Sequence, residues 1–206
     1  QVSSVNTNNV DWVVDGNIFT STSINITESS VASNTNWRML NNIFNGRVQS
    51  VSALYSYFYN NHFFYNGDPI ASSVSNCYFY NNIFYRSSPN NTLSSNIFSN
   101  NLAYQSSNDA FINGVNIEGQ DPMFEDFPSG GANFDYTHNY HLQSGSPGEN
   151  AGTDGSNIGV YGGNEGYFDL NGIPNIPQIR EFTITSGPSV APGSTIDINV
   201  KSTIKP

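Results

Sequence analysis

Apolar and polar residues follow a pattern that the chain repeats five times between about residues 12 and 104. In each copy, a short apolar or aromatic run leads into two polar residues, mostly Asn-Asn, and then into a second apolar pair. The copies align without gaps on one asparagine, in steps of 25, 19, 21 and 19 residues: Asn17, Asn42, Asn61, Asn82 and Asn101. A β-rich unit of this length cannot bury its own apolar face, so the pattern predicts a solenoid of stacked coils.

Positions in each copy are numbered from that asparagine, which is position 0. Strand alternation sends positions −5 and −3 into the core. Position −3 is apolar in every copy: Val14, Met39, Phe58, Phe79 and Phe98. Position −5 is more varied: Trp12, Trp37, Ser56, Cys77 and Asn96. Position +2 predicts an interior aromatic stack: Phe19, Phe44, Phe63, Phe84 and Ala103. Position +1 is left open between interior and semi-exposed, because the turn breaks the alternation: Ile18, Ile43, His62, Ile83 and Leu102.

The asparagines at position 0 have a structural explanation. A sharp bend between two strands often needs a left-handed residue, which Asn tolerates better than other non-glycine residues. Stacked amides can also hydrogen-bond between coils spaced about 4.8 Å apart. We therefore interpret the column as structural, not as a sugar-binding motif.

The rest of each coil contains shorter strand-like segments at 23–26, 48–51, 69–72 and 91–94. Over residues 12–104 the arrangement resembles the right-handed parallel β-helix of pectate-lyase-like proteins, in which three sheets wind around a filled core. The predicted fold class is all-β: a right-handed parallel β-helix of about five to seven coils with a short C-terminal β-hairpin.

Residues 105–163, the closing segment, carry four short motifs in order: Asp121-Pro-Met-Phe124, Leu142-Gln-Ser-Gly-Ser-Pro147, Ala151-Gly152 and Ile158-Gly-Val-Tyr161. The series resembles the closing segment of secreted bacterial β-helix proteins. In that family an Asp and an aliphatic residue precede Ala-Gly, whereas this chain has Glu149 and Asn150. The resemblance implies a secreted or cell-surface protein.

The sequence predicts a β-helix over 1–163, including the closing segment, a linker over 164–177 and a hairpin module over 178–206. Residues 1–11 are expected to form the first, imperfect edge of the stack. Strands at 178–184 and 195–200 would flank a Gly- and Pro-containing turn. Two strands are not stable alone, so the hairpin either docks on the β-helix or opens a β-sandwich module, and docking is favoured.

Composition narrows the partners. Only 11% of the residues are charged, and 16 acidic against 6 basic residues give a net charge of −10. Nucleic acid is not expected, because phosphate binding needs a basic surface. No apolar run approaches the roughly 18 residues of a membrane span. The single cysteine, Cys77, allows no intramolecular disulfide, and Gln1 is interpreted as a mature start without a signal peptide.

The outward positions −4 and −2 place four tyrosines on neighbouring coils: Tyr57, Tyr59, Tyr78 and Tyr80. Arg38 is expected to flank them, with Arg86 and Tyr85 nearby. Tyrosine rings can stack on sugars while their hydroxyls stay hydrogen-bonded, so this strip could bind a glycan. Alternatively it is covered by the closing segment, the hairpin or a partner protein, as outward aromatic patches often are.

Catalytic equipment is sparse. β-Elimination needs a base and a group that neutralises a carboxylate, and Arg38, His62 and Arg86 are only weak candidates. Glycoside hydrolysis needs two nearby carboxylates, and residues 12–104 contain only three acids, Asp15, Glu28 and Asp68.

Metal binding is not expected either. Asp135, His138 and His141 have a metal-like spacing, but in an extended segment the two histidines would face opposite sides. Asp121 is expected to cap a turn. No cofactor is predicted, and Ca²⁺ is the one alternative kept open.

Three hypotheses follow. The first is a non-catalytic secreted or surface protein that binds a polysaccharide or another surface protein through the tyrosines. The second is a polysaccharide-active enzyme, a lyase before a hydrolase, which predicts charges converging over the tyrosines. The third is a structural subunit of a surface assembly, in which another chain covers the tyrosines or the end coils.

Overall fold

The computed structural model describes residues 10–27, 35–51, 55–89, 95–105, 111, 113–128, 133–163, 178–184, 193 and 198–203. This part of the chain is all β and contains no helix, so it has none that could cross a membrane. The chain forms two compact units, Gln1–Tyr167 and Phe168–Pro206. The boundary falls within the predicted 164–177 linker. Residues 1–9 of the expected first edge lie outside the described residues.

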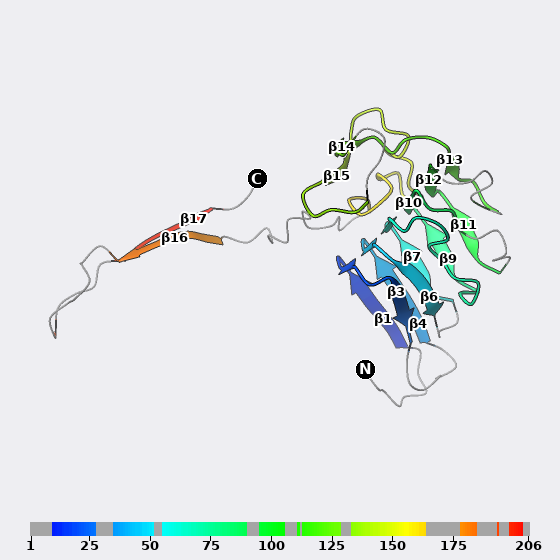
Figure 1. Ribbon diagram of the computed structural model, residues 1–206, viewed down its shortest axis with the longest axis horizontal. Helices are drawn as coiled ribbons and strands as arrows, with labels where there is room; N and C mark the ends of the chain where they lie inside the picture. The colour runs from blue at the N-terminus through cyan, green and yellow to red at the C-terminus, as the bar shows by residue number, and fades with distance from the viewer. Residues whose placement is uncertain are drawn as a thin grey trace. The chain divides into compact units, whose positions relative to one another are not determined.

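The first unit is a parallel β-solenoid (Figure 1). Its first sheet contains, in spatial order, β1 (Val10–Asp15), β4 (Thr35–Leu40), β7 (Tyr57–Tyr59), β9 (Tyr78–Tyr80) and β11 (Ile97–Ser99). Its second sheet contains β2 (Ile18–Phe19), β5 (Ile43–Phe44), β8 (His62–Phe63), β10 (Ile83–Tyr85), β12 (Leu102–Tyr104) and β13 (Ile117–Glu118). Strands pair in the predicted register, as Phe58 with Phe79 shows. The five strands of the first sheet, one from each repeat copy, span about four turns, where the sequence predicted five to seven coils.

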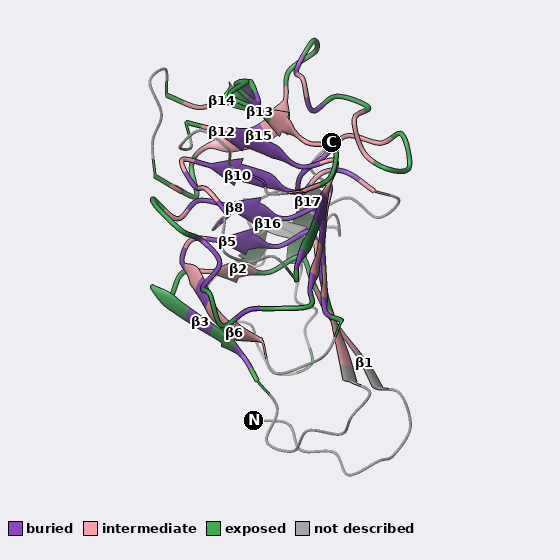
Figure 2. Ribbon diagram, turned by 90° about the vertical axis from the view of Figure 1, so that its right-hand side faces the viewer, coloured by how far each residue is buried: buried purple, intermediate pink, exposed green. Residues whose placement is uncertain are grey.

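Phenylalanine stacks fill the core between the sheets. The −3 rings of Phe58 and Phe79 lie 4.6 Å apart, and the +2 rings of Phe63 and Phe84 also lie 4.6 Å apart. Both columns are buried from the second coil onward, which confirms the predicted interior positions. Figure 2 shows β5, β8 and β10 of the second sheet as a row of buried strands. At position −5 the buried residues are Ser56, Cys77 and Asn96, whereas Trp12 and Trp37 are only partly buried.

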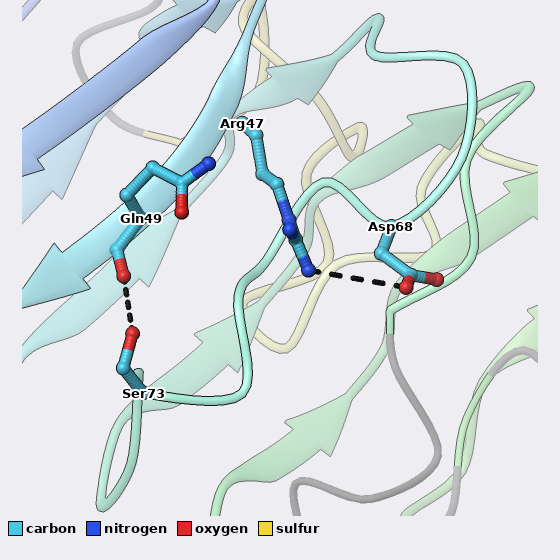
Figure 3. Close-up of polar contacts among 4 residues, drawn as sticks. All are labelled: Arg47, Gln49, Asp68 and Ser73. Carbon is cyan, nitrogen blue, oxygen red and sulfur yellow. Dashed lines mark hydrogen bonds and ion pairs between the residues drawn. The ribbon is translucent and has the colours of Figure 1, made fainter.

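The third side of the solenoid is less regular than predicted. β3 (Ser23–Ile26) and β6 (Arg47–Val51) pair in parallel, and the next coil adds only a bridge between Val48 and Ile70. Residues 91–94 lie outside the described part. An ion pair links Nη2 of the partly buried Arg47 to Oδ2 of the exposed Asp68 at 3.9 Å (Figure 3).

Each coil turns through the residue before the laddered asparagine, which corrects one prediction. The left-handed residues at this −1 position are Gly16, Asn41, Asn60, Asn81 and Asn100, with φ between 52° and 66°. Position 0 does not have this conformation in any coil. The left-handed role was therefore assigned to the wrong member of the Asn-Asn pair.

The predicted amide ladder at position 0 is confirmed. Asn61 Nδ2 donates to Asn82 Oδ1 at 2.9 Å, and Asn82 Nδ2 donates to Asn101 Oδ1 at 2.9 Å. From the second coil to the fifth, each amide also donates to the carbonyl at position −3 of the preceding coil, as Asn82 does to Phe58 at 2.8 Å. The ladder continues to Asn116, which accepts from Asn101 Nδ2 at 2.9 Å. The side chains thus satisfy buried backbone groups at every bend.

The closing segment covers the outer face of the second sheet and decides the position that the sequence left open. Position +1 is buried in the second to fifth coils, although it lies outside the phenylalanine core. Gly159 lies directly against this column: a Cβ there would be 2.2 Å from His62 Nε2 and 2.8 Å from Ile83 Cδ1. Its φ of 86° also favours glycine. Close packing therefore explains the glycine of the Ile158-Gly-Val-Tyr161 motif.

The closing segment contains an antiparallel strand pair, β14 (Phe124–Asp126) and β15 (Asn139–Leu142). The Ser146 hydroxyl donates to the Pro122 carbonyl at 2.6 Å, which joins two of the four motifs. Asp121 Oδ1 accepts from the Met123 N–H at 2.9 Å, so the predicted turn-capping role of Asp121 is confirmed.

The second unit contains an antiparallel pair, β16 (Gln178–Ile184) and β17 (Ile198–Thr203). This confirms the predicted antiparallel hairpin, and residues 195–197 of the expected second strand lie outside the described residues. Docking of the hairpin on the solenoid stays a prediction.

Candidate functional site

The four outward tyrosines form one block on the first sheet. Tyr57 and Tyr78 are stacked with ring centroids 4.9 Å apart and planes 12° apart. Tyr59 and Tyr80 are stacked at 5.2 Å and 21°. Along β7, the rings of Tyr57 and Tyr59 are within 7° of parallel and 5.9 Å apart. All four side chains are partly exposed. We call Tyr57, Tyr59, Tyr78 and Tyr80 the tyrosine block.

Parallel register produces this block and also sets its limit. Because strands of the first sheet pair position for position, equal residues in adjacent coils stack on one another. In the preceding coil, Arg38 lies beside Tyr57 and Leu40 lies beside Tyr59. Tyr57 and Tyr59 therefore each have one ring face that is turned away from β9 and lies over β4. No aromatic ring covers these two faces among the described residues at positions −4 and −2.

An open groove with a volume of about 860 Å³ begins at these two ring faces. Its residues come from the first three coils, from Asn81 and from the closing segment: Val13, Asp15, Asn36, Arg38, Leu40, Asn41, Tyr57, Tyr59, Asn60, Asn81, Thr153, Asp154 and Gly163. A smaller hollow of about 390 Å³ lies over the tyrosine block and Thr153. The groove thus combines an aromatic wall with amides, a hydroxyl and charged groups.

The left-handed asparagines fasten the opposite wall to the solenoid. Asn41 Nδ2 donates to the carbonyls of Val160 at 2.8 Å and Gly162 at 2.9 Å. Asn81 pairs twice with Thr153: its Oδ1 accepts from the Thr153 N–H at 3.0 Å, and its Nδ2 donates to Oγ1 at 3.2 Å. The residues that bend each coil therefore also position the closing segment.

Asn60 differs from Asn41 and Asn81, which hydrogen-bond the closing segment. It is 7% exposed and lines the groove, yet its Oδ1 has no hydrogen-bond partner among the described residues. A Cβ added to Gly163 would lie 2.5 Å from Asn60 Nδ2, so Gly163 has to pass closely over this amide. A buried acceptor without a partner destabilises a fold by about 1–3 kcal/mol.

Local contacts shift the pKa values of two groove residues, Asp154 and Tyr59. The Ser156 side chain donates to Asp154 Oδ1 at 2.6 Å and the Ser156 N–H donates at 3.0 Å. These bonds lower the pKa of Asp154, so its carboxylate is ionised at neutral pH. Burial, and then the neighbouring Tyr80, raise the pKa of Tyr59, which keeps its hydroxyl protonated and able to donate.

The three catalytic candidates that the sequence predicted do not lie together in the structure. Arg38 lines the groove. His62 lies on β8 in the second sheet, is 1% exposed and is packed against Phe124, with ring centroids 5.3 Å apart. Burial lowers the pKa of His62 to about 3. Arg86 follows β10, also in the second sheet, and is absent from the described lining of the groove. Its neighbour Tyr85 is 3% exposed beneath the closing segment, packed on Phe127 at 4.9 Å.

The residues with metal-like spacing have local partners. Asp135 Oδ1 accepts from the N–H and the hydroxyl of Thr137 at 2.8 and 2.7 Å, and these bonds lower the pKa of Asp135. His138 packs on Phe127, and His141 stacks on Tyr161 with ring centroids 3.6 Å apart. Within the described part of the chain, no three His, Cys, Asp or Glu residues are grouped closely enough to hold a metal ion.

Sequence reasoning missed the far wall of the groove. Thr153 and Asp154 follow the Ala151-Gly152 motif, but nothing in their spacing connects them to coils about 70 residues earlier. The −1 asparagines carried a usable signal. They recur in four copies, and the first copy has Gly16, the other residue type that favours left-handed backbone.

Comparisons with protein-family models, curated proteins and solved structures gave no significant match to this chain. The parallel solenoid therefore rests on the structure itself, and function has to be inferred from the groove.

Proposed function

We propose that the first unit is a non-catalytic carbohydrate-binding solenoid of a secreted or cell-surface protein, and that its ligand lies in the groove beside the tyrosine block. One observation carries the proposal: the near-parallel rings of Tyr57 and Tyr59 form an aromatic wall in an open groove that is otherwise largely polar. We propose a polysaccharide as the ligand, and the alternative ligand is a partner protein.

The aromatic wall suits a sugar for a physical reason. A sugar ring presents an apolar face of C–H groups and a rim of hydroxyls, so it gains from a flat ring on one side and polar groups on the other. Tyr57 and Tyr59 supply the flat side, with their ring centroids 5.9 Å apart along the strand. Amides, Thr153, Arg38 and Asp154 supply polar groups around it.

The groove is less suited to catalysis. Hydrolysis by two carboxylates needs one of them to hold a proton near neutral pH, whereas hydrogen bonds from Ser156 lower the pKa of Asp154. His62, the one histidine in the repeats, lies beneath the closing segment on the other sheet. Of the three candidate bases, this leaves Arg38 beside the tyrosines. These features favour binding over a lyase or hydrolase.

The cellular location is part of the same proposal. A polar chain with only 11% charged residues fits an extracellular solenoid. The ordered motifs of the closing segment, which resemble those of secreted bacterial pectate-lyase-like proteins, support it further.

The test combines a glycan array with a depolymerisation assay on neutral and acidic polysaccharides. Wild type is compared with Tyr57→Ala/Tyr59→Ala and with the control Tyr136→Ala, an exposed tyrosine (54%) outside the described groove lining. The proposal predicts binding by wild type and the control, loss in the double variant, and no new reducing or unsaturated ends. New chain ends would make the protein an enzyme and direct attention to Arg38. An absence of both signals would contradict the proposal and favour a protein partner at the tyrosine block.

A further inference from the structure

We infer that the groove selects uncharged glycans over glycans that carry carboxylates, and that Asp15 and Asp154 set this selectivity. The inference rests on the proposed function, because it concerns the glycan that would lie against Tyr57 and Tyr59.

The two carboxylates reach the groove from opposite sides. Asp15 ends β1 and is paired with Leu40 on β4, which places it at the solenoid side of the groove. Asp154 comes from the closing segment, next to the Thr153 that Asn81 clasps at 3.0 and 3.2 Å. A ligand in the groove therefore meets an acidic residue on either wall.

The balance of charge disfavours an anionic ligand. Among the described lining residues, Arg38 is the one cation and Asp15 and Asp154 are the two acids. The whole chain carries a net charge of −10, so the distant field has the same sign as the local one. A uronate carboxylate would have Arg38 as its one cationic partner and would be repelled by the two acids at short range.

The same acids suit an uncharged sugar. A carboxylate accepts hydrogen bonds from sugar hydroxyls, and such charge-assisted bonds are shorter and stronger than neutral ones. The Asp154 side chain is already oriented by Ser156, whose hydroxyl and N–H both bind Oδ1. That contact also lowers the pKa of Asp154 and keeps it an acceptor at neutral pH. The groove thus offers an ionised acceptor, Asp154, beside an aromatic wall.

The experiment measures binding to three matched pairs of immobilised oligosaccharides: glucose and glucuronate, galactose and galacturonate, mannose and mannuronate. The test variant is Asp15→Asn/Asp154→Asn, in which each amide keeps one acceptor oxygen. The control is Asp68→Asn/Asp126→Asn, which changes the net charge equally at two exposed residues outside the described groove lining. Thermal melts establish that each variant is folded.

We expect the neutral member of the bound pair to bind about fivefold tighter or more, from the repulsion of one unit charge at contact distance. The difference in affinity between the neutral sugar and the uronate should decrease as salt is raised. It should also decrease in Asp15→Asn/Asp154→Asn but not in the control. Equal or tighter binding of the uronate, or an equal effect of both variants, would overturn this inference while leaving glycan binding in place. Binding to none of the six probes would overturn the proposed function as well.

Discussion

Acidification should destabilise the solenoid through His62. This side chain is 1% exposed, and its Nδ1 has no hydrogen-bond partner among the described residues. Its ring lies 5.3 Å from that of Phe124 and 6.2 Å from that of Tyr140. Burial, and secondly the charge of His141, lower its pKa from 6.5 to about 3. Protonation in the folded state would place an unpaired charge in an aromatic pocket.

The sign and size follow from the two pKa values. Between pH 6.5 and about 3 the unfolded chain binds a proton at His62 that the folded chain does not. The free energy of unfolding therefore falls as the pH falls below 6.5, by up to about 1.4 kcal/mol per pH unit. At pH 4.5 the loss from this residue is about 3 kcal/mol relative to pH 7.5.

The assay is urea denaturation of wild type and His62→Leu at pH 7.5 and at pH 4.5. Leucine fits this column, because Leu102 occupies the equivalent buried position. Wild type should lose about 3 kcal/mol more than the variant. Asp135 and Asp154, whose pKa values are lowered, remain in both proteins, so the difference isolates His62. Equal losses in the two proteins would show that His62 does not cause the acid destabilisation.

Three further substitutions test the fold. Phe79→Asp should prevent folding, because an unpaired charge would enter the phenylalanine stack; an unchanged far-UV spectrum and melting point would show that position −3 is not interior. Asn82→Ala removes four hydrogen bonds of the ladder and should cost about 4 kcal/mol in urea denaturation, whereas a loss below about 1 kcal/mol would contradict the ladder's role. Asn81→Gly keeps the left-handed turn but loses both hydrogen bonds to Thr153, whereas Asn60→Gly removes an oxygen without a partner. The free energy of unfolding should therefore fall by about 1–2 kcal/mol more in Asn81→Gly than in Asn60→Gly. Equal melting points for these two glycine variants would show that the Asn81–Thr153 hydrogen bonds do not stabilise the fold.

Repetition made most of the core predictable. A single alternating strand leaves its inner face ambiguous, but five aligned copies show which column is always apolar, as with Phe58 and Phe79. Parallel register then follows, because each copy must place the same position above itself. The phenylalanine stacks at positions −3 and +2 could be predicted from the sequence for this reason.

The roles of the two adjacent asparagines were not separable by residue type alone. Asn81 turns the backbone and Asn82 carries the ladder, although both are asparagines in most copies. Gly16 was the distinguishing residue, since it substitutes for the left-handed asparagine and cannot replace an amide ladder. Assigning the bend to the ladder position overlooked this difference.

Long-range packing was the part that local patterns could not give. His62 and Ile83 are covered by the closing segment, which places Gly159 against both side chains and Phe124 against His62. Asp154 lines the groove in a segment that Asn81 holds through Thr153 and Asn100 holds through Ala151. No periodicity within the repeats encodes either contact. The site was therefore half predictable: its tyrosine wall follows from the repeat, and its acidic wall follows from the tertiary fold.

Oxidative footprinting with and without the tightest-binding glycan of the array maps contact at single tyrosines, so it shows whether a glycan lies against Tyr57 and Tyr59. We expect the glycan to slow modification of Tyr57 and Tyr59, which line the groove, and to leave Tyr136 unchanged. Protection of Tyr136 with no protection of Tyr57 and Tyr59 would place the ligand outside the groove and overturn the proposed binding site.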